Sequence, residues 1–241
     1  MLADDATIAG FIPYSTHVSP AVVKTTGGDY LITWRLDGLP FVGRDEWDIS
    51  HRHGSFNRLL QTLRAPDFCN LAFWVHDVRR RRRIENVDTF KQVFNQDLSD
   101  AYFRSLSSQK TMQNDLYLTM LYRPGASGKR LVERSSDIAR LTSEQTQAID
   151  TLLELAGNLE AVLRDYAPCR LGMYEGPNGV VFSETLEFFG YLLNRLDERV
   201  PVLDAPITQY LPISRHMFSA RTGDFVVNTP HGLNHFGAML N

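Results

Sequence analysis

The stretch that decides the fold is residues 21–37, AVVKTTGGDYLITWRLD. Two runs of β-favouring residues flank a Gly-Gly pair, and two glycines supply the positive φ angles that a tight hairpin turn requires. In the second run Tyr30, Ile32 and Trp34 occupy every other position, which predicts a strand buried mainly on one face. The segment therefore predicts a β-hairpin.

Beyond this hairpin, segments of helical period alternate with segments of strand period. Ser183 is a suitable N-cap for the last of the helices, since Glu184 and Glu187 follow it at the positive end of the helix dipole. The expected helices are 45–64, 89–105, 142–166 and 183–196, and the expected strands are 69–78, 114–122, 171–175 and 180–182. This order favours an α+β fold with a mixed or largely antiparallel sheet and packed helices.

The chain changes character after Val200. Prolines interrupt it repeatedly, a short apolar run follows at 225–227, and the sequence ends at Asn241 in what resembles a strand. We therefore expect two parts: an α+β domain over residues 1–200, and a Pro-rich stretch over 201–241 that begins a further β segment. The apolar ending leads us to expect a fragment of a longer protein.

The bulk composition is that of an ordinary globular protein. The formal net charge of -3 argues against a protein whose whole surface binds polyanions. The N-terminus lacks the apolar core of a signal peptide, and no apolar run reaches the ~18 residues of a membrane span. Cys69 and Cys169 have no neighbouring Cys or His partner, which indicates two buried thiols in a reducing compartment.

A glycine-rich loop at 123–130, RPGASGKR, invites comparison with a phosphate-binding loop. A P-loop needs a glycine five places before its Gly-Lys pair, and a Ser or Thr after the lysine to hold magnesium. Arg123 and Arg130 occupy these two places. The loop therefore lacks a Walker A motif, and we expect a connector rather than a nucleotide site.

The arginine run Arg79, Arg80, Arg81, Arg82 and Arg83 is the candidate contact for a partner or a phosphate. Such a run can bind nucleic acid, contact an anionic protein or lipid surface, or charge a solvated edge strand against aggregation. Side chains on a strand alternate between faces, so only about half of these arginines can share a surface.

Histidine pairs at 51/53 and 231/235 do not predict a metal site. A zinc site requires three or four ligands with supporting carboxylates, and each pair supplies only two. No GxSxG or comparable motif indicates a nucleophile. We expect no catalytic residue, no metal and no cofactor within the chain.

Several segments, in the same order and spread over nearly the whole chain, resemble the N-terminal region of the CagE/TrbE/VirB family of conjugation and type IV secretion ATPases. The matching segments are 11–18 (FIPYSTHV), 22–25 with 28–30, 34–38 (WRLDG), 71–76 (LAFWVH) leading into 78–81, 114–119 (NDLYLT) with 122–124, and 187–188 with 192–194. No single segment is specific, but their order and spacing are.

The resemblance implies a large ATPase at the cytoplasmic face of the bacterial inner membrane, well over twice this length. Its C-terminal RecA-like domain would hold the Walker motifs, ATP and Mg, and would energise pilus assembly and transfer of DNA or protein, as a hexamer. The N-terminal domain would dock on inner-membrane subunits, including a small membrane subunit and the cytoplasmic tails of bitopic subunits. This chain stops before the family's P-loop, so no catalytic residue is carried over.

Two placements and one alternative function accompany this hypothesis. Irregular segments and open sheet edges are common docking places, so we expect docking at the sheet edge near Arg79–Arg83 or in the Pro-rich stretch around 206–212. The alternative is a basic DNA-binding module of the conjugation machinery, which would use Arg79–Arg83 and lose affinity steeply with salt.

Overall fold

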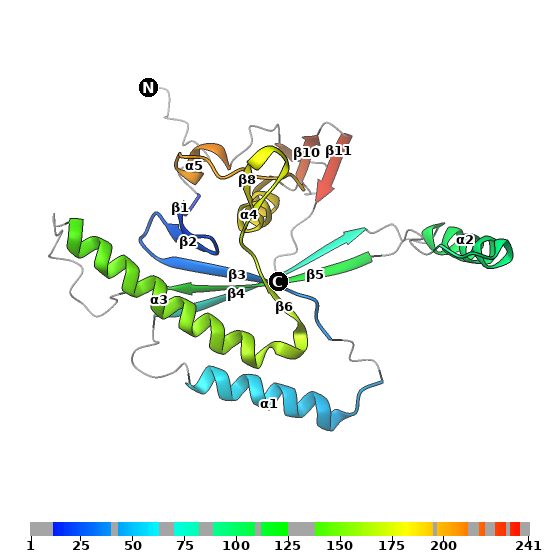
Figure 1. Ribbon diagram of the computed structural model, residues 1–241, viewed down its shortest axis with the longest axis horizontal. Helices are drawn as coiled ribbons and strands as arrows, with labels where there is room; N and C mark the ends of the chain where they lie inside the picture. Colours follow the sequence, from blue (N-terminus) through cyan, green and yellow to red (C-terminus); the bar gives the residue numbers. More distant parts are fainter. Residues whose placement is uncertain are drawn as a thin grey trace.

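The computed structural model describes residues 12–39, 43–62, 70–81, 89–108, 112–124, 138–194 and 197–211, together with three strands between 217 and 236. The elements (Figure 1) are β1 (Tyr14–Ser19), β2 (Val22–Thr25), β3 (Tyr30–Leu36), α1 (Glu46–Thr62), β4 (Leu71–Arg81), α2 (Val93–Ser108), β5 (Met112–Tyr122), α3 (Ile138–Val162), η4 (Arg164–Tyr166), β6 (Pro168–Arg170), β7 (Met173–Glu175), η5 (Pro177–Gly179), β8 (Val181–Ser183), α4 (Glu184–Asn194), α5 (Ile207–Tyr210), β9 (Met217–Ser219), β10 (Phe225–Thr229) and β11 (Gly232–Phe236).

An antiparallel sheet with strand order β1-β2-β3-β5-β4 forms the centre of the molecule. β2 pairs with the first half of β3, and β6 pairs with its second half, from Trp34↔Arg170 to Leu36↔Pro168. β4 lies at the edge of this order. The expected α+β fold with a largely antiparallel sheet is confirmed.

Two apolar cores lie on opposite faces of this sheet. Side chains of β3 and β5 such as Trp34 and Met120 pack against α3, whereas Leu31 and Leu121 pack with α4 and α5. Figure 1 shows α1 and α3 along one face and α4 and α5 along the other. The period of two along each strand thus divides the apolar residues between two helical layers.

The expectation that β3 is buried mainly on one face is wrong. Leu31 and Thr33, which point away from α3, are as fully buried as Ile32. The Thr33 and Thr119 hydroxyls share a hydrogen bond of 2.9 Å, which satisfies both polar groups within the second core. Because α4 covers this face, the central strand needs apolar or satisfied side chains on both sides.

A polar network anchors α3 to the centre of the sheet. Trp34 Nε1 donates to Glu160 at 2.5 Å, and Arg170 Nε donates to the same carboxylate at 2.7 Å. Burial alone would raise the pKa of Glu160, but the hydrogen bonds from Arg170 and Trp34 outweigh it and lower that pKa. The ionised carboxylate therefore joins α3, β3 and β6.

The helices and strands expected from the sequence are present, with bounds shifted by a few residues. Ser183 caps α4 as predicted, since its Oγ accepts from Leu186 N at 3.2 Å. β1 is an additional strand that the sequence did not indicate. Cys169 is exposed, contrary to the expectation of a buried thiol, because it lies on the short strand β6; Cys69 lies outside the described residues.

The residues after Val200 are described only in part. Ile207 and Leu211 are buried in the core beneath α4. The apolar run at 225–227 lies in β10, which pairs with β9 and β11 in a separate antiparallel sheet. The division at residue 200 stays a prediction.

Candidate functional site

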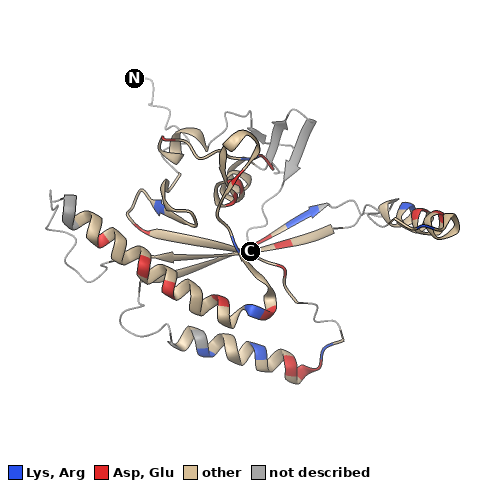
Figure 2. Cartoon of the chain, in the orientation of Figure 1, with Lys and Arg blue, Asp and Glu red and all other residues tan. Residues whose placement is uncertain are grey.

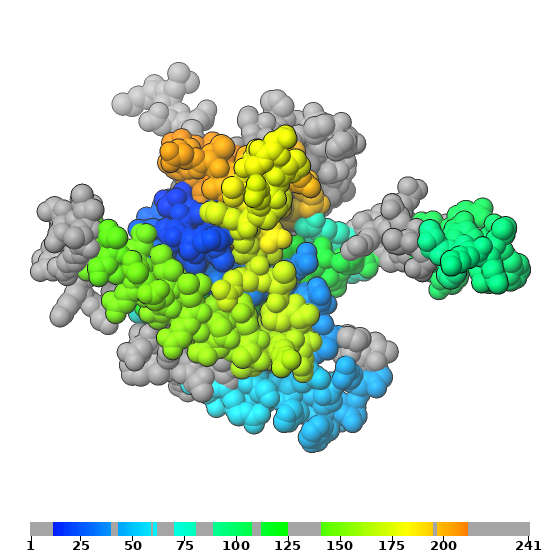
Figure 3. All heavy atoms as spheres, viewed as in Figure 1, coloured from blue at the N-terminus to red at the C-terminus, as the bar shows by residue number. Residues whose placement is uncertain are grey.

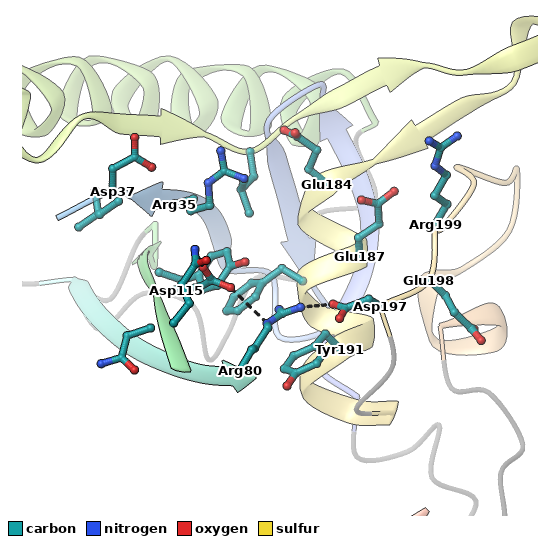
Figure 4. A pocket seen from close by; sticks show the side chains of 16 residues that line it. Arg35, Asp37, Arg80, Asp115, Glu184, Glu187, Tyr191, Asp197, Glu198 and Arg199 are labelled. Atoms are coloured by element: carbon teal, nitrogen blue, oxygen red, sulfur yellow. Dashed lines mark hydrogen bonds and ion pairs between the residues drawn. The ribbon is translucent and has the colours of Figure 1, made fainter. Parts of the chain in front are cut away.

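A polar cleft of about 650 Å³ opens between the central sheet and α4. Its walls come from β3, β4 and β5 on one side, and from α4 and residues 197–199 on the other. Figure 4 shows Arg35 of β3 with Glu184 and Glu187 of α4 around the same opening. A cavity of this volume is large enough for a few residues of a partner chain.

Arg80 of β4 is the most strongly held charge in the cleft. Its Nε lies 3.2 Å from the Asp115 carboxylate, and its Nη1 donates to Asp197. The guanidinium carbon lies 4.0 Å from the centroid of the Tyr191 ring, within the range of a cation–π contact. Arg80 therefore ties the sheet to α4 and to the segment that follows α4 (Figure 4).

The local backbone explains why Arg80 reaches the cleft. Strand alternation places it on the same face as Val78, which packs in the core beneath α4. Burial opposes the charge on Arg80, but the hydrogen bond and charge of Asp197 outweigh it, so the pKa of Arg80 is raised. Burial raises the pKa of the neighbouring Tyr117 hydroxyl, with the positive charge of Arg80 opposing that shift.

Carboxylates outnumber guanidinium groups two to one on the cleft wall. The acidic residues are Asp37, Asp115, Glu184, Glu187, Asp197 and Glu198, and the basic residues are Arg35, Arg80 and Arg199. The opening therefore has an excess of negative formal charge at neutral pH. Low-dielectric walls strengthen the field of such a cleft toward an incoming cation.

Two of the acidic side chains are fixed in position by short-range partners. Glu184 Oε2 accepts from Gly172 N at 3.2 Å, and Glu187 Oε1 accepts from the Tyr174 hydroxyl at 2.7 Å. Burial and the bond to Glu187 raise the pKa of Tyr174. These contacts orient the carboxylates of α4, so the cleft has a preformed acidic wall.

The arginine run is divided between surfaces. Arg79 is exposed and lies on the face opposite Arg80. β4 ends at Arg81, and Arg82 and Arg83 lie outside the described residues. In Figure 2 basic and acidic residues are spread over the described elements.

Arg123, at the start of the glycine-rich loop, has a structural partner. Its Nε and Nη2 donate to the Asp29 carboxylate at 3.0 and 2.9 Å. This hydrogen bond, supported by the charge of Asp29, raises the pKa of Arg123. The bidentate pair joins the hairpin before β3 to the end of β5; residues 125–130 lie outside the described part of the chain.

The described residues contain no cluster of three or more His, Cys, Asp or Glu that could hold a metal ion. His51 on α1 stacks on Trp47, at a centroid distance of 5.1 Å. Within the same residues, every helix is too short or too polar to cross a membrane.

Comparison with known proteins decides the family. Residues 21–130 match the N-terminal domain model of the type IV secretion system ATPase VirB4/TrbE. The chain is 34% identical over 221 residues to the type IV secretion system protein VirB4 of Brucella suis. The chain contains the N-terminal domain of the VirB4/TrbE family.

Other type IV secretion system proteins match over a similar range. The chain is 29% identical over 225 residues to PtlC of Bordetella pertussis, and 30% identical over 215 residues to VirB4 of Bartonella quintana. The Brucella suis match covers 87% of this chain and 26% of the relative. The chain thus spans about a quarter of the length of the relatives it matches.

Proposed function

We propose that this chain is the docking and assembly domain of a type IV secretion ATPase. It attaches the motor to inner-membrane subunits of the secretion machine, namely a small membrane subunit and the cytoplasmic tails of bitopic subunits. ATP and Mg bind in a part of the ATPase outside this chain. The whole ATPase works as a hexamer and energises pilus assembly and transfer of DNA or protein. The domain acts peripherally, at the cytoplasmic face of the inner membrane.

The observation that carries this proposal is the acidic cleft. Its walls come mostly from strands and a helix, and the carboxylates of Glu184 and Glu187 are held by neighbouring groups before any partner arrives. A preformed wall of one sign selects partners by charge and speeds their association. We infer that the cleft receives a Lys- or Arg-containing segment of an inner-membrane subunit, lying across α4 and the edge of the sheet.

The absence of a complete phosphate-binding motif in the sequence supports the same division of labour. Arg123, in the place of the first P-loop glycine, is committed to Asp29. DNA contact through Arg79–Arg83 has less support, since Arg80 is paired with two carboxylates and stacked on Tyr191. An arginine that is already paired with carboxylates neutralises DNA phosphates poorly and releases few counterions, so it adds little affinity for DNA.

Titration of labelled cytoplasmic segments of the cognate inner-membrane subunits against the 241-residue chain tests the proposal. The double variant Asp37→Asn with Glu187→Gln keeps the size of both side chains and removes two negative charges from the cleft. We expect it to weaken binding of a basic segment by roughly 3- to 10-fold.

The matched control removes the same charge from a remote surface. Asp150→Asn with Glu154→Gln changes two exposed carboxylates on α3 and should leave binding unchanged. If no inner-membrane subunit binds the chain although the whole ATPase binds it, the docking function is wrong. Binding that survives the cleft variant would place the docking site elsewhere.

A further inference from the structure

Helix α2 projects from one end of the molecule, beyond the ends of β4 and β5 (Figures 1 and 3). Its large apolar side chains are unusually exposed: Val93 is 76% exposed, Phe94 74%, Leu98 60% and Tyr102 60%. Scattered exposed apolar residues are normal, but several on one helix indicate a surface that binds something.

Four of the exposed residues of α2 follow a coiled-coil pattern. Phe94, Leu98, Ala101 and Ser105 are separated by four, three and four residues, which is the spacing of a heptad seam. All four are exposed. Large side chains occupy the first half of the seam and small ones occupy the second half, so the seam has a direction.

Charged residues flank the seam on one side only. Asp97 and Arg104 are seven residues apart and therefore lie on the same flank, whereas Asn95 and Tyr102 lie on the other. Both Asp97 and Arg104 are exposed. In an antiparallel helix pair, equal flanks of the two helices face each other.

We propose that α2 binds α2 of a second copy of this chain as an antiparallel pair about a two-fold axis. With the axis between residues 99 and 100, Phe94 lies opposite Ser105 of the second copy, and Leu98 lies opposite its Ala101. Each large side chain thus meets a small one, in both halves of the interface.

The same register aligns the charges. Asp97 comes beside Arg104 of the second copy, and the two-fold axis repeats this pair. Both charges on the charged flank of each helix therefore lie beside an opposite charge. A parallel pair would place Phe94 against Phe94 and would turn the charged flank toward Asn95 and Tyr102, which carry no charge. The charge pattern therefore favours the antiparallel arrangement over the parallel one.

Charge also argues against a lipid surface as the occupant. Asp97 and Asp100 lie on the helix, and anionic headgroups repel both. A helix of 16 residues is about 24 Å long, so the pair buries less than a standard protein interface. The interface is therefore of modest strength, and the fraction of dimer should depend on the concentration of the chain.

Reciprocal charge exchange tests the pairing directly. Asp97→Arg places four positive charges across the interface, and Arg104→Asp places four negative ones, so each variant alone should lose dimer. A mixture of the two variants restores both opposite pairs and should dimerise again. A single chain carrying both exchanges should also dimerise, because it reverses each pair without removing it.

Sedimentation velocity of the 241-residue chain over a hundredfold range of concentration measures the association, with circular dichroism to confirm that every variant is folded. Asp150→Arg on the exposed surface of α3 is the matched control and should dimerise like the unchanged chain. We expect at least a fivefold loss of association for each single exchange and recovery in the mixture. A chain that stays monomeric throughout, or a dimer that both single exchanges leave intact, would overturn the proposal.

Discussion

Replacing Arg80 by methionine should destabilise the domain, whereas the same replacement of the adjacent Arg79 should not. Methionine keeps most of the aliphatic stem of arginine and removes the guanidinium group. At position 80 this change leaves Asp115 and Asp197 without their cation and uncovers the Tyr191 ring. Arg79 is exposed on the opposite face, so its replacement controls for the loss of one positive charge from β4.

The magnitude follows from the exposure of the partners. The Arg80 and Asp115 side chains are 25% and 21% exposed, so solvent screens this pair only partly, and it contributes about 1 kcal/mol. Asp197 is 68% exposed, so its contribution is at most a few tenths of a kcal/mol. The stack on Tyr191 adds about 0.5–1 kcal/mol.

We therefore expect Arg80→Met to lower the free energy of unfolding by about 2 kcal/mol, or Tm by roughly 4–8 °C for a chain of this size. Arg79→Met should stay within about 0.5 kcal/mol of the unchanged chain. Urea denaturation followed by circular dichroism measures both. Equal stabilities for the two variants, or full additivity of Arg80→Met with Asp115→Asn, would refute the structural role assigned to Arg80.

Two further predictions concern the packing of glycines and a partly buried histidine. Gly176→Ala should lower the free energy of unfolding by about 1–3 kcal/mol, because its Cβ would lie 2.5 Å from the Phe182 ring. Gly157→Ala in α3 meets nothing within 4 Å, so it should raise the free energy of unfolding by about 0.5–1 kcal/mol. Thermal denaturation compares the two variants, and a destabilised Gly157 variant would contradict the packing described. Burial lowers the pKa of His17, whose Nε2 lies 2.9 Å from Ser183 Oγ, so the folded chain binds that proton less readily than the unfolded chain. The free energy of unfolding should therefore fall as the pH drops below about 6.5. His17→Gln should make the free energy of unfolding depend less on pH, as measured by urea titrations at several pH values. If His17→Gln leaves the pH dependence unchanged, groups other than His17 cause it.

Local pattern was sufficient for most of the fold. The Gly-Gly turn before β3 forms as expected, with Gly28 at φ +83°, and Ser183 caps α4. The sequence pattern did not predict strand β1, because its residues are mostly polar and only partly buried. The pattern also did not predict that the second face of β3 is buried, because the helix that covers it, α4, comes about 150 residues later in the chain.

The candidate site was beyond local pattern for a similar reason. The arginine run marks β4 as highly charged, but it does not indicate the carboxylate that binds Arg80, because Asp197 lies 117 residues away in sequence. Nothing in the sequence around Asp115 indicates a partner for it, since only the register between β4 and β5 brings it near Arg80. The cleft is formed by strand pairing in the sheet and by the position of α4 and residues 197–199 against it. Neither can be predicted from a short segment of sequence.

Cross-linking from within the cleft, in the whole ATPase and in intact cells, tests the docking function most directly. A photoreactive residue at Glu198 lies on the cleft wall, and one at Glu154 lies on the exposed surface of α3 as a control. The docking account predicts that the Glu198 probe captures an inner-membrane subunit of the secretion machine and that the Glu154 probe does not. Capture of such a subunit from neither position, in cells where secretion is active, would contradict it.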